Sequence, residues 1–341
     1  MTQTQIPKQM TAVVLDSYSG AEALRIEQRP VPKPGKDEVL VKVAASPINP
    51  SDLAFLDGNY GFDKSPPVVP GGEGSGTVVA VGPGAMGRYF LGKQVACLSN
   101  GERDGIWAEY IVASTKGGVF ALSKSVSLEQ GAMSIINPLT ASAFLEITKA
   151  DGHKAIVLTA AASALGQMVN RLGRSEGVQV INVVRRDAQV ELLKAQGATI
   201  VLNSNEGDFD RQLHEACHQY DAHLAFDAVA GPMTGQLLNA LPKNSTITVY
   251  SCLSRKAPQT HVDQIVFQGK TITGFWLGPW LNSNKNLLQI LTLWRRSQKL
   301  IATDLKTEIR ARYAFQDAKK AVQDYSSQMT GGKVLLTPTA S

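Results

Sequence analysis

The stretch that decides the fold is Lys154–Gly166, KAIVLTAAASALG. It begins with an apolar run typical of a buried strand and continues into a turn of small residues. Apolar residues then recur at helical spacing from Leu165 to Leu172. A strand, a small-residue turn and a helix together can hold the pyrophosphate of a dinucleotide at the helix N-terminus. Only Gly166 stands where such turns usually have three glycines, so an ordinary strand–turn–helix unit explains this stretch equally well.

Downstream of this stretch, strand-like and helix-like segments alternate. The predicted strands are AIVLTA, VQVINVV, TIVLN, AHLAFDAV and STITVYS, each followed by a helical pattern except the last. The strands are almost wholly apolar, which is typical of a parallel sheet buried on both faces. Alternation of this kind predicts an α/β fold, with a doubly wound parallel sheet of the Rossmann type.

The chain upstream has a different pattern. Short alternating runs such as TAVVLD, VLVKVAAS and GTVVAVG, separated by turn signals, predict a β-rich sandwich or partly open barrel up to about residue 125. Residues 127–150 are predicted to be helical, with Pro138 at a break or helix start. The final run, GKVLLTP, resembles a strand that completes the N-terminal domain. We therefore expect a discontinuous catalytic domain, 1–125 with 281–341, and a nucleotide-binding domain, 126–280.

Bulk properties exclude several classes of protein. The length of 341 residues suits two domains, and the net charge of +5 comes from dispersed residues without an aromatic-interleaved basic stripe, which argues against nucleic acid. No apolar run is long enough to span a bilayer, and the N-terminus lacks a targeting pattern, so we expect a cytoplasmic protein with no membrane partner. The three cysteines are scattered and predict neither disulfides nor a cysteine-rich metal site.

The small-residue turn is still compatible with a dinucleotide. Alanine and serine fit wherever φ is negative, and the helix dipole and backbone N–H groups that bind phosphate do not require glycine. Ser163 adds a hydroxyl that can donate to a phosphate oxygen. The predicted cofactor-binding turn consists of Ala161, Ala162, Ser163, Ala164, Leu165 and Gly166.

The end of the second predicted strand indicates which dinucleotide is bound. NAD sites place an acidic residue there for the ribose 2′-hydroxyl. This chain offers Val184, Arg185 and Arg186 instead, and a guanidinium suits a 2′-phosphate. Asp187 follows and is interpreted as the N-cap of the next helix. The alternative is that both arginines are merely solvated; we predict NADPH as the cofactor.

Several motifs resemble the medium-chain dehydrogenase/reductase superfamily over essentially the whole chain. They are INPSDL, PGGEGSGTVVAVG, GKQV and GGKVLLTP. The resemblance implies a GroES-like catalytic domain, built from both termini, and a Rossmann domain. It also implies a homodimer, for which STITVYS and the later KTITGFWL offer a strand edge.

The resemblance also bears on zinc. Zinc-dependent members of the superfamily supply a cysteine where SPINPSD stands and a histidine where Gly72 stands in GGE. Here the first position is Asn49 or Pro50, and the segment that matches the four-cysteine structural lobe holds one cysteine. Zinc needs three or four nitrogen or sulfur ligands. We therefore predict that this chain has no metal site.

Within the superfamily, GNYG, INPLTASAF, INVVRR and GFWLGPW resemble the mitochondrial-type 2-enoyl thioester reductases. That likeness implies that Tyr60 is the hydrogen-bond or proton donor to the substrate, and that Trp276 lies near the nicotinamide and acyl chain. A surface turn tyrosine is the alternative for Tyr60. Quinone oxidoreductases share related segments but usually have a GGVG turn, and ASALG departs from both groups.

The remaining candidates have two interpretations each. Asn49 either orients the substrate or ribose or is a turn residue, and Thr140 either meets the nicotinamide or is a helix-interior residue. Trp276 and Trp280 form either an acyl-binding wall or part of the core or a dimer contact. Further nucleotide contacts are expected from Tyr250, Phe275, Trp276 and Lys333.

Together, these features predict a zinc-independent, NADPH-dependent reductase that transfers hydride to an activated C=C bond of a small molecule. The alternatives are an NADPH:quinone oxidoreductase and a non-catalytic NADPH-binding protein.

Overall fold

The computed structural model describes residues 6–61, 64–99 and 103–339. Their contacts divide the chain into two compact units. The first comprises Met1–Ile136, Gln298–Ala302 and Lys306–Ser341, and the second comprises Asn137–Ser297 and Thr303–Leu305. The second unit starts and ends later than the expected segment 126–280. Beyond residue 280, Lys285 and Arg296 form ion pairs with Glu146 and Glu176 of the same unit.

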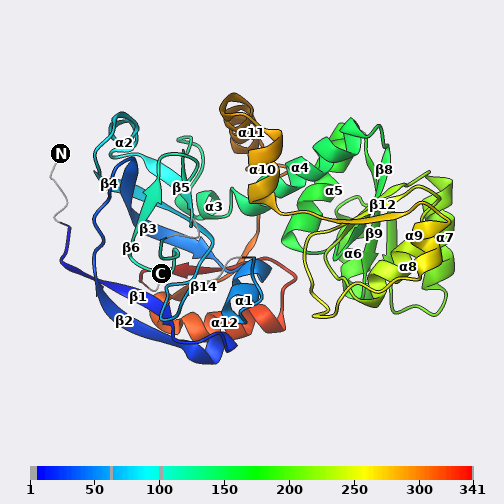
Figure 1. Cartoon of the computed structure of the whole chain (residues 1–341), viewed down its shortest axis with the longest axis horizontal. Coiled ribbons are helices and arrows are strands. Elements are labelled where there is room, and N and C mark those ends of the chain that lie inside the picture. The colour runs from blue at the N-terminus through cyan, green and yellow to red at the C-terminus, as the bar shows by residue number, and fades with distance from the viewer. Residues whose placement is uncertain (1–5, 62–63, 100–102, 340–341) are drawn as a thin grey trace. The chain divides into compact units, whose positions relative to one another are not determined.

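The first unit is rich in strands (Figure 1). Its elements are β1 (Gln9–Leu15), η1 (Gly20–Ala23), β2 (Leu24–Pro30), β3 (Glu38–Pro47), α1 (Pro50–Leu56), β4 (Glu73–Val81), α2 (Ala85–Phe90), β5 (Gln94–Leu98), β6 (Tyr110–Ser114), β7 (Val119–Ala121), α3 (Leu128–Ala132), β14 (Ile309–Ala314), η2 (Phe315–Asp317), α12 (Ala318–Ser327) and β15 (Lys333–Thr337). The larger sheet has the order β14-β15-β3-β4-β5-β7, with β6 also paired to β3. The C-terminal strand β15 therefore joins the N-terminal sheet, as the sequence predicts.

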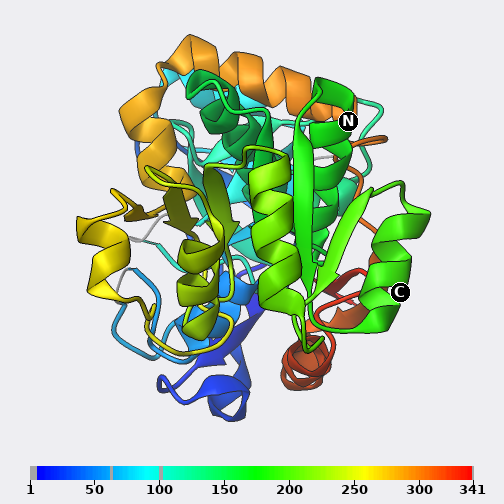
Figure 2. The ribbon, with the colours of Figure 1, turned by 90° about the vertical axis from the view of Figure 1, so that its right-hand side faces the viewer.

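The second unit contains the parallel sheet. Its elements are α4 (Ile136–Ala150), β8 (Ala155–Thr159), α5 (Ala164–Glu176), β9 (Gln179–Val184), α6 (Asp187–Ala195), β10 (Ile200–Asn203), α7 (Phe209–Gln219), β11 (Leu224–Asp227), α8 (Pro232–Ala240), β12 (Thr246–Val249), α9 (Val262–Val266), β13 (Thr271–Gly274), α10 (Leu277–Asn284) and α11 (Leu287–Leu300). All neighbouring strands are parallel, in the order β10-β9-β8-β11-β12-β13 (Figure 2).

Strand order reverses between β8 and β11. Right-handed crossovers then place α5 and α6 on one face of the sheet and α7 and α8 on the other. Both faces are covered, and every residue of β8 is accordingly buried. This arrangement confirms the predicted doubly wound parallel sheet. A sheet of this kind binds its ligand at the carboxyl ends of the strands beside the reversal.

Local sequence explains the helices at that end of the sheet. On α5, the periodic apolar residues Leu165, Met168, Val169 and Leu172 are buried, and the helix stops at Gly177, whose φ is 73°. Pro138 is the third residue of α4, where its missing N–H has no intrahelical partner to lose, as expected for a helix start.

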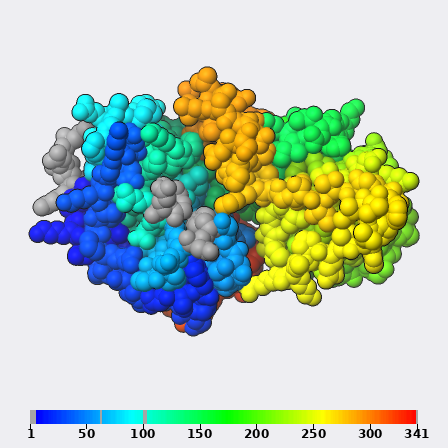
Figure 3. Space-filling view, in the orientation of Figure 1, coloured from blue at the N-terminus to red at the C-terminus, as the bar shows by residue number. Residues whose placement is uncertain are grey.

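Strand β13 forms one edge of the parallel sheet. This strand and the helix α9 that precedes it are largely exposed, and their part of the chain appears in yellow on the surface in Figure 3. Among the described residues, no helix combines the length and the apolar character that crossing a bilayer would require.

Candidate active site

The turn between β8 and α5 has the geometry of an anion site. Ser163 is the N-cap of α5, and its Oγ accepts a hydrogen bond from Gly166 N at 3.1 Å. The hydroxyl hydrogen can still be donated. The N–H groups of Ala164 and Leu165 belong to the first helical turn, whose donors have no partner within the helix. The residues present therefore fit a phosphate group.

Gly166 is the one glycine that this turn requires. A Cβ atom at this position would lie 2.3 Å from the carbonyl oxygen of Ala161, so helix and turn could not approach as closely. Ser163 has φ −67°, and the positive φ of the turn, 49°, falls on Ala160. Serine is thus compatible with its position, as predicted, while the left-handed residue lies one place before the predicted turn.

The predicted phosphate-recognising arginines lie at the same end of the sheet. Thr159 at the end of β8 pairs with Val183 of β9, and Ala161 N donates to Val183 O at 3.3 Å. Val184 is buried as the last residue of β9, and the two residues after it, Arg185 and Arg186, are exposed. The turn and the arginines therefore follow adjacent strands at one sheet edge.

The interpretation of Asp187 as a helix cap is wrong. Arg186 is the N-cap of α6, and Asp187 is the first helical residue. Its carboxylate is engaged elsewhere, because Oδ1 accepts a hydrogen bond from Nδ2 of Asn203 at 2.7 Å.

An aromatic cluster lies within the second unit. Phe144 of α4 stacks on Phe226 with ring centroids 3.9 Å apart, and its ring meets Tyr250 at 5.0 Å and Phe275 at 5.1 Å in edge contacts. Trp280 lies 6.1 Å from Phe275. The structure thus brings together three predicted ligand-binding residues, two of which directly follow strands β12 and β13.

Two further predicted cofactor-binding residues lie close in sequence to members of this aromatic cluster, but they differ in exposure. Thr140 is buried on α4, one turn before Phe144, whereas Trp276 at the N-cap of α10 is 44% exposed.

Burial raises the pKa of the Tyr250 hydroxyl, and the Asp227 charge adds to this, so the phenol stays protonated at neutral pH.

Asp227, at the end of β11, was missed by the sequence reasoning. It is fully buried, and Oδ1 accepts hydrogen bonds from Thr159 Oγ1 at 2.9 Å and Val229 N at 2.8 Å. Its Oδ2 accepts from Thr234 Oγ1 at 2.8 Å. Because these bonds join β8, β11 and α8, Asp227 fixes the loop beside the strand reversal. The only sequence signal is an acid at the end of an otherwise apolar run.

The first unit holds a buried polar cluster made of Asn49, Asp52, Glu73 and Lys333. Asn49 donates from Nδ2 to Glu73 Oε1 at 3.0 Å, and its Oδ1 accepts from Lys333 Nζ. Asp52 accepts from Asn49 N at 2.7 Å and from Gly72 N at 2.9 Å. The predicted substrate residue Asn49 and the predicted nucleotide residue Lys333 therefore contact each other, and their roles in binding stay predictions.

Burial has the largest effect on the pKa values of the three ionisable groups in this cluster. It raises the pKa of Glu73 to about 7 and that of Asp52 to about 6, and it lowers the pKa of Lys333 to about 8. The nearby opposite charges reduce these shifts without cancelling them. The cluster is therefore sensitive to pH near neutrality.

Tyr60 follows α1, in a turn in which Gly58 has φ 72°. Its ring is half-buried against the apolar core of the first unit. That placement is compatible with a packing role and with a donor role, so the catalytic assignment stays a prediction.

The zinc prediction can be compared with the residues in place. The side chain of Asn49 is bonded within the polar cluster, and Gly72 offers no side-chain ligand. Among residues 6–61, 64–99 and 103–339, no group of three or more His, Cys, Asp or Glu side chains could hold a metal ion. Zinc independence remains a prediction.

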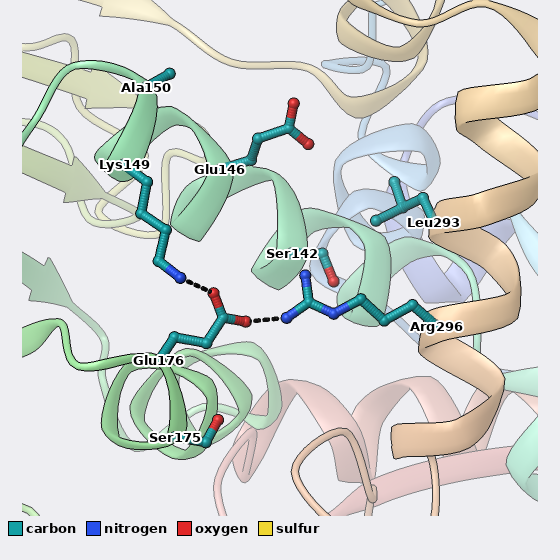
Figure 4. A pocket seen from close by; sticks show the side chains of 8 residues that line it. All are labelled: Ser142, Glu146, Lys149, Ala150, Ser175, Glu176, Leu293 and Arg296. Atoms are coloured by element: carbon teal, nitrogen blue, oxygen red, sulfur yellow. Dashed lines mark hydrogen bonds and ion pairs between the residues drawn. The ribbon is translucent and has the colours of Figure 1, made fainter.

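A separate pocket of about 580 Å³ lies between α4, α5 and α11 of the second unit (Figure 4). Glu176 forms an ion pair with Lys149 at 2.6 Å and a second ion pair with Arg296. None of the predicted site residues lines this pocket. Its ion pairs link the three helices, and we assign the pocket no role in binding.

Known proteins resemble both units. Residues 164–292 match the family model Zinc-binding dehydrogenase, and residues 35–124 match Alcohol dehydrogenase GroES-like domain. The mitochondrial enoyl-[acyl-carrier-protein] reductase of Arabidopsis thaliana is 29% identical over 280 residues, covering 80% of this chain and 74% of its own. The Homo sapiens enzyme of that name is 27% identical over 311 residues, covering 88% and 81%.

A crystal structure of a Mesorhizobium loti protein, provisionally described as an NADPH:quinone reductase, is 34% identical. Its TM-score is 0.91, and the match covers 98% of this chain and 100% of its own.

A GroES-like unit and a Rossmann unit define a pyridine-nucleotide-dependent oxidoreductase acting on small molecules. The chain belongs to the medium-chain dehydrogenase/reductase superfamily.

Proposed function

We propose that this oxidoreductase uses NADPH to reduce an activated C=C bond, as in a 2-enoyl thioester or a related enone or enal, without zinc. The observation that carries the cofactor assignment is the pair of exposed arginines directly after β9, because β9 pairs with β8 and the Ser163 turn follows β8. Support for the substrate comes from the names of the enoyl reductase relatives and from the presence of Tyr60.

Apart from Lys333 of the first unit, the residues that would hold the cofactor come from the second unit. The Ser163 turn and the first N–H groups of α5 would bind the pyrophosphate, and Arg185 with Arg186 would bind the 2′-phosphate. Tyr250 and Phe275, which follow neighbouring strands, would flank the nicotinamide. When bound, the nicotinamide supplies a hydride to the substrate.

Tyr60 has the chemistry to assist the reaction. As the β-carbon of the substrate is reduced, negative charge develops on the conjugated carbonyl oxygen, and a preorganised donor stabilises that charge. A tyrosine hydroxyl is protonated at neutral pH, since free phenols ionise at a pH of about 10. Tyr60 would donate a hydrogen bond to this oxygen and could pass the α-proton directly or through water.

A quinone reductase is the second candidate. The specific observation favouring it is the relative at 34% identity, whose provisional name is NADPH:quinone reductase. A quinone is already electrophilic, so its reduction would not depend on a tyrosine donor.

The deciding experiment follows NADPH oxidation by absorbance with crotonyl-type thioesters, 2-alkenals and quinones, with NADH in parallel. We expect the highest kcat/KM with an enoyl substrate and NADPH. Turnover of quinones alone would replace the enoyl assignment by the quinone reductase. Equal use of both nucleotides would contradict the cofactor assignment. Activity that chelators abolish and zinc restores would contradict zinc independence.

A further inference from the structure

We propose that Asn203 determines cofactor choice by holding the Asp187 carboxylate away from the ribose of a bound dinucleotide. This inference rests on the proposed preference for NADPH and adds a residue that enforces it. Asn203 would be a positioning residue, because it acts through Asp187 and the neighbouring arginines.

Asp187 directly follows Arg186 and is the first acidic residue beyond the end of β9, close to the position at which NAD-specific sites carry the acid that binds ribose hydroxyls. The same carboxylate would repel a 2′-phosphate. A carboxylate at this position would therefore oppose the attraction that Arg185 and Arg186, just before it, would exert on the phosphate. In the structure one oxygen of this exposed carboxylate is engaged, because Asn203 Nδ2 donates to Asp187 Oδ1 at 2.7 Å.

The amide of Asn203 is itself held in place. The residue is buried, with 7% of its surface exposed, and its Oδ1 accepts a hydrogen bond from Asn205 N at 3.1 Å. This bond orients the amide so that its nitrogen faces Asp187. A buried amide with both ends engaged has little freedom to release its partner.

The position of Asn203 in the sheet sets the direction of its effect. Asn203 lies on β10 and pairs with Val184, and β10 is on the opposite side of β9 from β8. The dinucleotide turn follows β8. The bond therefore draws the carboxylate toward the outer strand, away from the turn that would carry the cofactor.

The same loop also contacts the backbone of Arg185. Asn205 donates from Nδ2 to Arg185 O at 2.8 Å, and Arg185 N donates to Gln189 Oε1 at 3.2 Å. Both backbone groups of Arg185 are thus bonded to side chains, while its own side chain is exposed. Residues 203–205 consequently hold the acid back and keep the backbone of Arg185 in one position.

The test measures dissociation constants of NADPH and NADH for the purified full chain by fluorescence titration, without turnover. The variants are Asn203→Ala, Asp187→Asn and the double variant. With Asp187 present, Asn203→Ala should lower the preference for NADPH over NADH by about tenfold, the effect of one like charge beside the phosphate. With Asp187→Asn, the same substitution should change that preference by less than about twofold.

Controls separate this mechanism from loosened structure. Glu206→Gln removes an exposed acid from the same loop and should leave the preference unchanged. Asn203→Ser, which keeps an oxygen that can accept from Asn205 N, replaces the alanine variant if that one does not fold. An equal loss of preference with and without the Asp187 charge, or no loss in either background, would overturn the proposal.

The outcome for the unmodified chain separates the two claims. If that chain shows no preference for NADPH, the proposed cofactor is wrong and Asn203 has nothing to enforce. If it prefers NADPH and Asn203→Ala retains the full preference, the proposed function stands and this inference fails.

Discussion

Arg185 and Arg186 allow the most direct test at the scale of single residues. We expect the Arg185→Ala/Arg186→Ala double variant to bind NADPH more weakly by roughly 10-fold to 100-fold, because charge-assisted hydrogen bonds to a phosphate are lost. NADH affinity should change little, since its ribose lacks the phosphate. Fluorescence titration with both nucleotides measures the effect. A double variant that retains the preference for NADPH would assign both arginines to the solvated surface.

Tyr60→Phe tests the proposed donor. The ring is half-buried against an apolar core, and phenylalanine preserves that packing. We expect kcat for an enoyl substrate to fall by about 10²–10³, the usual effect of losing one preorganised donor to a developing oxyanion. NADPH affinity and thermal stability, measured alongside, should be unchanged.

A Tyr60→Phe variant within about threefold of the original on every accepted substrate would make Tyr60 a packing residue. It would also favour the quinone reductase, which does not depend on a hydroxyl donor.

The sequence was a good guide to individual residues where local chemistry decides their role. Ser163 has the negative φ that serine needs, whereas its cap position and the close contact of Gly166 with Ala161 emerge only from the structure. The prediction for Asp187 was wrong because aspartate is a common cap, and its partner Asn203 lies on β10, 16 positions further along the chain. Asp227 was missed for a similar reason, since its bond to Thr159 joins residues 68 positions apart.

At the scale of the element, Gly166 determines how α5 meets the turn. We expect Gly166→Ala to lower the free energy of unfolding by about 1–3 kcal/mol, because the added methyl meets the Ala161 carbonyl at 2.3 Å and the backbone must shift. NADPH affinity should fall with it, since the same turn would hold the pyrophosphate. Denaturant unfolding and fluorescence titration measure the two effects.

Gly278 provides a matched control. It also lies in the first turn of a helix, α10, but an added Cβ would meet nothing within 4 Å. Gly278→Ala should be neutral or stabilise the chain by up to about 1 kcal/mol, the difference in helix propensity. Similar losses at both positions would show that the close contact at Gly166 does not determine stability.

Strands were easier to predict from the sequence where they are buried. The parallel strands were found because burial on both faces demands an apolar run, and AIVLT of β8 is wholly buried. By contrast, β2 (LRIEQRP) has no fully buried residue and carries three charges, so its pattern did not indicate a strand. The short strand β7, with three residues, was also missed, because so short a run has no measurable period.

At the scale of the whole molecule, buried Glu73 should make stability depend on pH. Its pKa is raised from an ordinary 4.5 to about 7, so the folded state binds the proton more tightly than the unfolded state. This contribution is fully present below about pH 4.5 and is lost as the pH rises through 7. Asp52, with a pKa raised to about 6, acts in the same direction.

We therefore expect the chain to lose on the order of 2–3 kcal/mol relative to Glu73→Gln between pH 4.5 and 8, because glutamine does not titrate. Urea unfolding at several pH values measures this difference. Parallel stability curves for the two proteins would mean that Glu73 has the same proton affinity in both states.

The last prediction concerns assembly. Strand β13 is the final strand of the parallel sheet, and three of its four residues are exposed. Helix α9, which precedes β13 in the sequence, and its C-cap expose apolar side chains, with Val266 61% and Phe267 76% exposed. An exposed strand edge beside exposed apolar residues favours pairing with a second copy about a two-fold axis.

We expect light scattering to give twice the chain mass for the original protein and the monomer mass for Phe267→Asp, since a charge would be desolvated at the contact. Leu288→Asp is the matched control, because Leu288 is 75% exposed on α11, away from β13 in the sequence. It should leave the dimer intact. A chain that is monomeric at every concentration, or a dimer that Leu288→Asp disrupts and Phe267→Asp does not, would exclude this edge as the interface.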